Sequence, residues 1–275
     1  MSEAPFARRL LSVTAVEELG AYRVLRVADP DEGGRGSIPK PGQFAMLSAA
    51  EHWGAEEGQR PFLARALSIA RHSEGESHFL LEDVGPGTKR LCELRAGDGV
   101  WALGPLGRGF TPPSEGRRAV LVGGGVGIAP LAILQDELAG SVTVLLGFRD
   151  RAHAQGAALL DGARVATDDG STGHHGLVTE LLAADLERDP EAVVYACGPS
   201  GMLEGVRALC AERDVPAQLA LEAGMACGFG ACFGCVVEKR GGGYLRVCVD
   251  GPVVDAGELE RVSEPVGGAE FGGPA

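Results

Sequence analysis

The chain has 275 residues, which exceeds the usual single domain and indicates two domains with room for a small third module. Hydrophobic residues make up 45% and charged residues 23%, so the chain can bury a core and is not disordered overall. With 25 Lys and Arg against 38 Asp and Glu, the net charge is −13, which repels phosphate backbones. Nucleic acid is therefore not an expected partner.

Neither a membrane span nor a secretory signal is apparent. The run from Ala119 to Leu134 is interrupted by glycine and proline and is too short to cross a bilayer. The N-terminus lacks the apolar stretch of a signal peptide. These features predict a cytoplasmic protein with no membrane partner.

Residues 1–117 have the pattern of an antiparallel barrel. Short alternating stretches are separated by Gly/Pro turns: SVTAVEEL, AYRVLRV, QFAMLSA and HFLLEDV. Strands at this spacing favour a small barrel or sandwich. One short helix is expected from Thr88 to Leu94, with Thr88 as its N-cap.

Residues 118–222 change to alternating strands and helices. The predicted strands are AVLVGG, SVTVLLGF, ARVATDD, AVVYACG and QLALE. Helices are expected in IAPLAILQDELAG, around Leu177 to Leu182, and from Ser200 to Glu212. This alternation predicts a parallel sheet with helices on both faces, an α/β domain.

Residues 223–275 hold a cysteine loop and a hairpin. Four of the seven cysteines follow the spacing C-x4-C-x2-C-x12-C: Cys227, Cys232, Cys235 and Cys248. This is the ligand pattern of plant-type [2Fe–2S] centres, in which soft thiolates bind iron. If Gly241 and Gly242 form a two-residue turn, the hairpin register sets Cys235 opposite Cys248. The alternatives are a structural zinc or buried free thiols, but zinc sites more often show two C-x2-C pairs.

Two glycine-rich turns in the α/β part are candidate nucleotide sites. LVGGGVGIAPL joins a strand to a helix and reads G-x-G-x-x-P across Gly125, Gly127 and Pro130. Tyr195 to Leu203 places Cys197, Gly198 and Pro199 at the same carboxyl edge of the sheet, where open α/β folds bind ligands. Either turn alone is also compatible with a purely structural role.

The barrel part carries a weaker set of signals. Arg65 and Ser68 lie on one predicted strand and could face one ligand, and Gly85, Gly87 and Thr88 at a helix start could hold a phosphate. Without the rest of the chain, a solvated arginine and a plain turn would be the better explanation of these residues.

This order of parts and motifs resembles the ferredoxin–NADP⁺ reductase-like family, and within it the electron-transfer subunits of class B dihydroorotate dehydrogenases. The resemblance runs from about Ser12 to Leu259 and is most specific in EAGMACGFGACFGCVV and RVCVDGPVV. It implies a flavin-binding antiparallel barrel, a nucleotide-binding parallel-sheet domain and a small C-terminal [2Fe–2S] module, with the cluster bound by the four cysteines. The implied cofactors are FAD, one [2Fe–2S] cluster and NAD(H) as substrate.

The resemblance also assigns binding residues. The family's Arg-Pro-x-Ser motif corresponds to Arg65, Ala66, Leu67 and Ser68, with alanine in place of proline. The Gly-x-Gly-Thr motif corresponds to Gly85, Gly87 and Thr88, and the strand before it to Leu80, Leu81 and Glu82. The residues implied to border the nicotinamide nucleotide are Gly125, Gly127, Pro130, Cys197, Gly198 and Pro199.

The implied function is electron transfer from NADH through FAD and the cluster to the FMN of a catalytic dihydroorotate dehydrogenase subunit, in a heterotetramer. No catalytic acid or base is expected, because hydride transfer to a flavin depends on placement. Phe229 and Phe233 are expected to dock the partner, although both rings could instead pack inward. Asp150, after the second strand of the α/β domain, favours NADH over NADPH.

Two other functions remain open. One is the small subunit of an electron-bifurcating NADH-dependent ferredoxin:NADP⁺ oxidoreductase or of a sulfide dehydrogenase, in which an Asp replaces the first cluster cysteine; Cys227 argues against it. The other is a non-catalytic redox sensor, which the retained nucleotide motifs disfavour.

Overall fold

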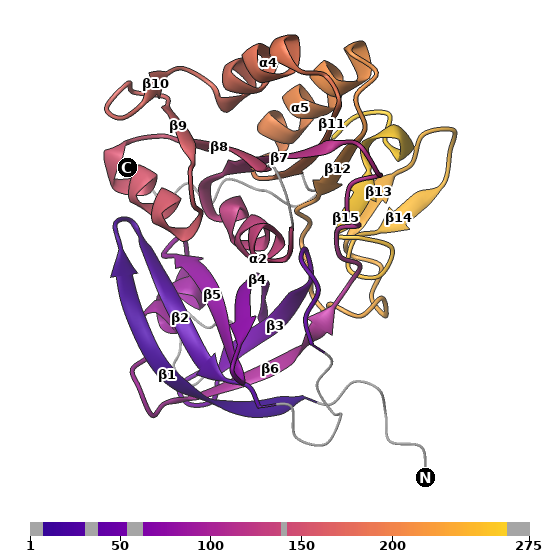
Figure 1. The fold of residues 1–275 in the computed structure, drawn as a ribbon. Helices are drawn as coiled ribbons and strands as arrows, with labels where there is room; N and C mark the ends of the chain where they lie inside the picture. Colours follow the sequence, from indigo (N-terminus) through magenta and orange to yellow (C-terminus); the bar gives the residue numbers. More distant parts are fainter. Residues whose placement is uncertain (1–7, 31–37, 54–62, 139–141, 263–275) are drawn as a thin grey trace, which may run out of the picture.

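Within residues 8–30, 38–53, 63–138 and 142–262, which the computed structural model describes, the first part folds into a closed antiparallel barrel (Figure 1). Its strands follow the order β1-β2-β5-β4-β3-β6. Alternating apolar residues point inward, as Leu11 and Val13 do on β1. The elements are β1 (Arg9–Leu19), β2 (Tyr22–Ala28), β3 (Phe44–Ala49), β4 (Arg65–Ser73), β5 (Glu76–Glu82), α1 (Pro86–Cys92) and β6 (Gly99–Leu106).

The second part is an α/β domain whose sheet has the order β10-β9-β8-β7-β11-β12-β15. All neighbouring strands are parallel except β15, which runs antiparallel to β12. The strands are β7 (Arg118–Gly124), β8 (Val142–Phe148), β9 (Arg164–Thr167), β10 (His174–His175), β11 (Ala192–Cys197), β12 (Ala217–Ala220) and β15 (Val253–Asp255). The α-helices are α2 (Ala129–Glu137), α3 (Arg151–Ala154), α4 (Val178–Arg188) and α5 (Ser200–Glu212).

Helices cover both faces of this sheet (Figure 1). α2 lies between the sheet and the barrel and packs on β4, whereas α4 and α5 lie on the opposite face. The described residues also form three 3₁₀ turns: η1 (Gly125–Ile128), η2 (Gln155–Leu159) and η3 (Ala256–Glu258). The C-terminal module holds β13 (Val236–Glu238) and β14 (Tyr244–Arg246), and it lies beside both larger parts.

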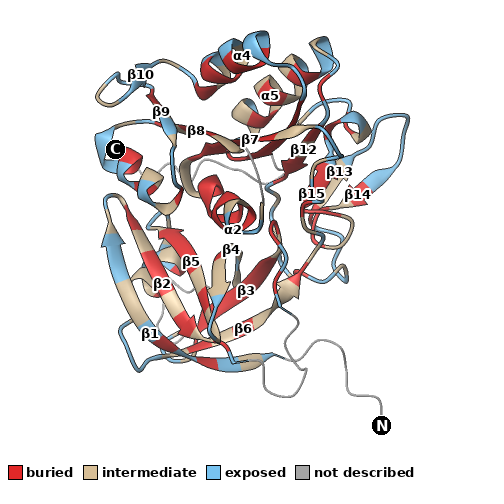
Figure 2. Ribbon diagram, in the orientation of Figure 1, coloured by how far each residue is buried: buried red, intermediate tan, exposed pale blue. Residues whose placement is uncertain are grey.

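One hydrophobic core cluster connects all three parts (Figure 2). It contains Phe44 and Met46 of the barrel, Val120 of the sheet, and Cys235 and Cys248 of the C-terminal module. Burial of such apolar surface contributes about 25 cal/mol per Å². The parts are therefore packed as one body, which fixes the relative positions of the sites that they carry.

The predicted fold class is confirmed, with local differences. The helix expected at 88–94 begins earlier, at Pro86, because proline fits the first turn of a helix. Thr88 therefore lies inside α1, and the N-cap of α1 is Gly85. The helix expected at 177–182 continues to Arg188, and residues 139–140 of the helix expected at 128–140 lie outside the described residues. Among the described residues, no helix has the length and apolar character to cross a bilayer.

Candidate functional site

A cavity of about 320 Å³ lies where the barrel meets the α/β domain. β4 contributes Ala66, Leu67 and Ser68, and β5 contributes Leu80. Its opposite wall includes Gly127 and Cys197 from the nucleotide turns, together with Ala220–Ala223, Met225 and Pro252. Residues of the predicted flavin motif therefore face residues of the predicted nicotinamide motif across one cavity.

Arg65 points elsewhere. It is three residues from Ser68, an odd separation that places the two side chains on opposite faces of a regular strand. The Arg65 guanidinium donates a hydrogen bond from Nη1 to the Leu63 carbonyl at 2.5 Å. It also packs directly on α1, since a Cβ added at Gly87 would meet Arg65 Nε at 2.3 Å. Ser68 lines the cavity, whereas Arg65 is not among its lining residues.

The remaining residues of the predicted flavin site lie in three different places: the barrel core, a second cavity and the start of α1. Leu81 is fully buried in the barrel core, whereas Glu82 lines a second cavity. The Thr88 hydroxyl donates to the Gly85 carbonyl and accepts from the Val84 N–H, both at 3.1 Å. Thr88 therefore stabilises the turn that begins α1.

The two glycine-rich turns touch each other. A Cβ added at Gly127 would lie 2.6 Å from the Cys197 carbonyl carbon and 2.6 Å from Gly198 Cα, so only glycine allows this approach. Gly125 has a φ of 56°, which also favours glycine. Pro130 is buried in α2, outside both cavities, while Pro199 lines the second one. Burial, together with the nearby Glu222, raises the pKa of the Cys197 thiol and keeps it protonated.

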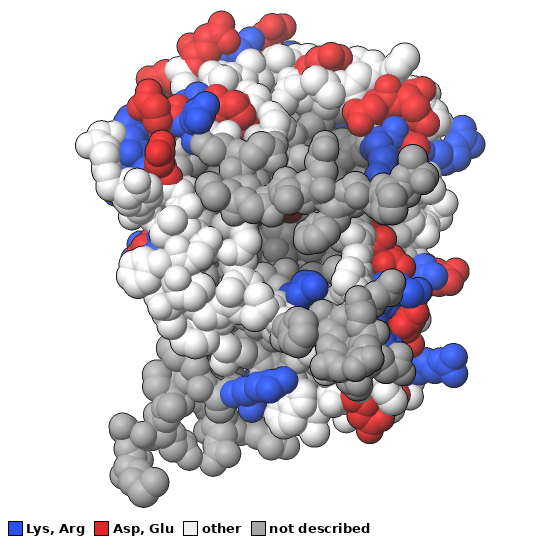
Figure 3. All heavy atoms as spheres, turned by 180° about the vertical axis from the view of Figure 1, so that it is seen from behind, with Lys and Arg blue, Asp and Glu red and all other residues white. Residues whose placement is uncertain are grey.

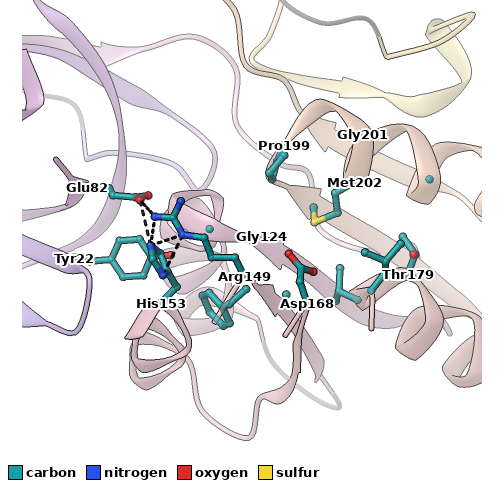
Figure 4. Close-up of a pocket in the computed structure, with 16 residues that line it drawn as sticks. Tyr22, Glu82, Gly124, Arg149, His153, Asp168, Thr179, Pro199, Gly201 and Met202 are labelled. Atoms are coloured by element: carbon teal, nitrogen blue, oxygen red, sulfur yellow. Dashed lines mark hydrogen bonds and ion pairs between the residues drawn. The ribbon is translucent and has the colours of Figure 1, made fainter. Parts of the chain in front are cut away.

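The second cavity, of about 450 Å³, opens at the carboxyl ends of β7, β8, β9 and β11 (Figure 4). Arg149 donates from Nη2 to Glu82 Oε1 at 2.8 Å, which joins the α/β domain to the barrel. His153 lies 3.2 Å from the same carboxylate oxygen and contacts Arg149. Burial, and then the charge of Glu82, raises the pKa of the neighbouring Tyr22. Gly125 and Pro199 are the predicted nucleotide residues in this cavity.

Asp150 does not line this cavity. It caps α3, accepting the His153 N–H at 3.0 Å, and its Oδ1 lies 2.7 Å from His153 Nδ1. Hydrogen bonding from His153 lowers the pKa of the Asp150 carboxyl. Two carboxylates line the cavity: Glu82, which is paired with Arg149, and Asp168, which lies directly after β9 (Figure 4). Strand-end position could have identified Asp168 and Arg149, which directly follow β9 and β8, whereas Tyr22 and His153 join them only in the fold.

The four cysteines of the C-terminal loop lie in two pairs. Cys235 Sγ and Cys248 Sγ are 3.2 Å apart, and the Cys248 N–H approaches Cys235 Sγ at 3.4 Å. The Cys232 side chain lies close enough to the Cys227 thiol to help lower its pKa. Among the described residues, no three His, Cys, Asp or Glu are grouped to hold one metal ion. A [2Fe–2S] cluster instead takes four thiolates on two irons, so a paired arrangement fits it.

Backbone N–H groups of the loop point at these sulfurs. Burial alone would raise the pKa of the Cys227 thiol, but the N–H groups of Phe229, Cys232 and Ala231 lower it to about 6. For Cys248, burial and the adjacent Cys235 thiol raise the pKa to about 12, opposed by the Gly230 N–H. N–H groups aimed at anionic sulfur are what an iron–sulfur centre requires. The donor set therefore suits this cofactor.

The predicted hairpin register is wrong by one residue. Val236 pairs with Arg246 and Glu238 with Tyr244. The Lys239 N–H donates to the Gly243 carbonyl at 3.1 Å, so the turn contains the three residues 240–242. The Val247 N–H accordingly donates to the Cys235 carbonyl at 2.9 Å, and Cys248 lies one position further along. The two sulfurs still meet because the chain turns after β14 and directs Cys248 back to Cys235.

The cysteine loop packs on the barrel but exposes its aromatic rings. A Cβ added at Gly228 would lie 2.5 Å from Met46 Cγ, so the backbone of the loop at Gly228 packs directly on the Met46 side chain of β3. Phe229 is 52% exposed and Phe233 is 62% exposed. Neither ring packs inward, which excludes the inward alternative.

Comparisons with known proteins agree with this architecture. A family model described as the iron–sulfur cluster binding domain of dihydroorotate dehydrogenase B matches residues 222–260. The solved structure of an NADH-dependent reduced ferredoxin-NADP oxidoreductase aligns with a TM-score of 0.76 and 26% identity, over 95% of this chain and 92% of that one. A ferredoxin reductase of carbazole 1,9a-dioxygenase has the same fold, with a TM-score of 0.63 at 24% identity over 77% of this chain and 67% of that one.

Fold and cysteine loop together define an oxidoreductase of the ferredoxin-reductase class that carries an iron–sulfur binding domain. Two curated relatives narrow this class. The proteins from Bacillus caldolyticus and Desulforamulus reducens are 42% and 39% identical over 80% and 78% of this chain, and 86% and 84% of their own lengths. Both are named dihydroorotate dehydrogenase B (NAD(+)), electron transfer subunit. The chain belongs to this family.

Proposed function

We propose that the chain passes electrons between NAD(H) and the FMN of a catalytic dihydroorotate dehydrogenase subunit, by way of FAD and a [2Fe–2S] cluster. The observation that carries this proposal is the pairing of the four cysteine thiols in a loop that packs on β3. The names of the relatives support the electron-transfer role.

When bound, FAD takes up the two electrons of a hydride together and a [2Fe–2S] cluster passes electrons one at a time. The residues of this chain hold and orient these groups. Arg65 on Gly87 supplies a positive charge for the flavin phosphates, and Ala66 and Ser68 line the cavity for the ring system. Cys227, Cys232, Cys235 and Cys248 hold the cluster. We assign no general acid or base, because hydride transfer depends on placement.

Asp168 supports NADH rather than NADPH as the nucleotide. Its carboxylate points into the larger cavity, where it can accept hydrogen bonds from a ribose diol and would repel a 2′-phosphate (Figure 4). Arg149, the arginine among the described lining residues, is already paired with Glu82. This role was expected of Asp150, whose carboxylate instead caps α3.

The partner is proposed to dock on the exposed face of the cysteine loop. Phe229 and Phe233 are more than half exposed, and aromatic residues are enriched at protein interfaces. Seen from behind, the side of the molecule that holds the C-terminal module has a broad area with few charged side chains (Figure 3). A surface of this kind fits a protein partner, and two copies of each subunit would form the heterotetramer.

Phe229→Asp tests the docking surface. We expect NADH-driven reduction of an artificial dye to persist, because the path from NADH to FAD lies within this chain. NADH-linked dihydroorotate turnover with the partner should fall at least about tenfold, as for the loss of an interface anchor. Leu10→Asp is the matched control, since Leu10 is 57% exposed on the barrel strand β1, away from the loop. If both activities survive and the complex still forms on a sizing column, the docking surface lies elsewhere.

Iron and acid-labile sulfide assays test the cluster itself. Purified protein should be yellow-brown, bleach with NADH and contain two irons per chain. A colourless protein with zinc would favour the redox-sensor alternative. Reduction of ferredoxin without any dihydroorotate-linked turnover would favour the bifurcating oxidoreductase, whose solved structure has this fold.

A further inference from the structure

Arg246 on β14 reaches across to the cysteine loop. Its Cζ lies 5.3 Å from the centre of the Phe233 ring, within the range of a cation–π contact. Its Nη1 is 3.4 Å from the position that a Cβ at Gly230 would take. Gly230 and Phe233 both belong to the C-x4-C-x2-C segment. The guanidinium therefore stacks on the Phe233 ring and lies beside the backbone at Gly230, on the two sides of Cys232.

Asp250 holds this arginine in place. Asp250 Oδ2 lies 3.4 Å from Arg246 Nε and accepts the Arg246 backbone N–H at 2.9 Å. The Asp250 N–H donates back to the Arg246 carbonyl at 2.7 Å. The Arg246 side chain is 34% exposed, so its charge is only partly screened by water. Asp250 therefore fixes the backbone and the Nε of Arg246, while the guanidinium stacks on the Phe233 ring of the loop.

The two loop residues beside Arg246 lie where the backbone is turned toward sulfur. Phe233 has a φ of 57°, a conformation that is strained for a bulky residue and persists only where its surroundings fix it. The next N–H, that of Gly234, approaches Cys232 Sγ at 3.5 Å. The N–H of Gly230 is directed at the Cys248 sulfur.

We propose that Arg246 is a positioning residue for the iron–sulfur site, which braces the loop through the Phe233 ring and makes the bound cluster easier to reduce. Reduction adds negative charge to a site of four thiolates, so a nearby fixed cation and well-aimed N–H groups both favour the reduced form. The inference rests on the cluster assigned under the proposed function.

The test is the reduction potential of the cluster, followed by electron paramagnetic resonance during a redox titration of the full chain. Arg246→Gln removes the charge, whereas Arg246→Lys keeps it and loses the flat contact over the ring. We expect Arg246→Gln to lower the reduction equilibrium constant about tenfold, which is about 59 mV for a one-electron couple. Arg246→Lys should recover most of this shift.

Arg240→Gln is the matched control. Arg240 lies on the same hairpin, pairs with Glu260 at 3.6 Å and is 49% exposed, so its loss changes the net charge equally. An equal shift in Arg240→Gln, or an unchanged potential in Arg246→Gln with its cluster intact, would overturn the inference. Loss of the cluster in Arg246→Gln with FAD retained, reversed in Arg246→Lys, would support it.

Loss of both cofactors and of the thermal transition in both Arg246 variants would also overturn it, because Arg246 would then be required for folding in general. The proposed function fails separately. In that case the unsubstituted chain would contain no iron, and no variant would be needed to show it.

Discussion

Replacement of Arg65 tests the flavin site most directly, because this side chain stands apart from the cavity that the rest of its motif lines. The guanidinium is held by the Leu63 carbonyl at 2.5 Å and packs on Gly87 at the start of α1. Partial burial lowers the pKa of Arg65, although an arginine remains charged at neutral pH. A fixed, partly desolvated cation of this kind is suited to phosphate.

The expected magnitude follows from the loss of one charge-assisted contact, about 1.5–3 kcal/mol, which weakens FAD binding about ten- to hundredfold in Arg65→Ala. Gly87→Ala should weaken it less, since the added methyl group displaces only the flexible end of Arg65. Arg90→Ala is the control, because Arg90 lies on α1 and pairs with Glu93 at 4.0 Å on the surface.

The assay is FAD content per chain after extensive dialysis, together with the dissociation constant from flavin fluorescence. Circular dichroism should show an unchanged fold in each variant. If Arg65→Ala retains as much FAD as the unsubstituted chain, Arg65 does not belong to the flavin site, and the arginine of the family motif does not bind the flavin in this chain.

Three further predictions concern the other sites. Cys232→Ser should remove the iron absorbance while FAD stays bound in the barrel cavity, as measured by iron content and flavin spectrum; retention of two irons would contradict the ligand assignment. Asp168→Asn should lower the preference for NADH over NADPH at least about tenfold in kcat/KM for dye reduction. Asp169→Asn removes the same charge outside the cavity and should change this preference much less. Asp185→Ala should destabilise the chain by about 3 kcal/mol in denaturant unfolding, because it leaves three arginines around a 4% exposed position without their shared carboxylate.

The fold was predictable where periodic patterns are long. The apolar runs of β7, β8 and β11 and the alternation in β1 and β2 carry strong signals, so the barrel and the parallel sheet follow from the sequence. β15 was missed because three residues, Val253–Asp255, carry too little pattern to assign a strand. The hairpin register failed at Gly241–Gly243, where three glycines at positive φ allow a three-residue turn as readily as a two-residue one.

The cysteine site was predictable because its spacing is local in the sequence. The residues that line the larger cavity were predictable only in part. Arg149 and Glu82 are 67 positions apart and meet across two domains, and no spacing rule reports such a pair. Asp150 was chosen by strand order alone, but the local need to cap α3 takes its carboxylate. Asp168 ends the neighbouring strand, so the same rule applied to every strand end would have included it.

β3 sets the separation between the proposed flavin cavity and the cysteine loop. Phe44 lines the cavity and Met46 touches the loop at Gly228. These two residues are two positions apart and therefore on one face of the strand, with Ala45 in the barrel core on the other. Two positions span about 7 Å. A side chain at residue 228 would have to displace either the loop or Met46. Glycine at this position therefore lets the loop pack directly on Met46, and the regular pairing of β3 with β4 holds Met46 at a fixed distance from Phe44 in the cavity wall.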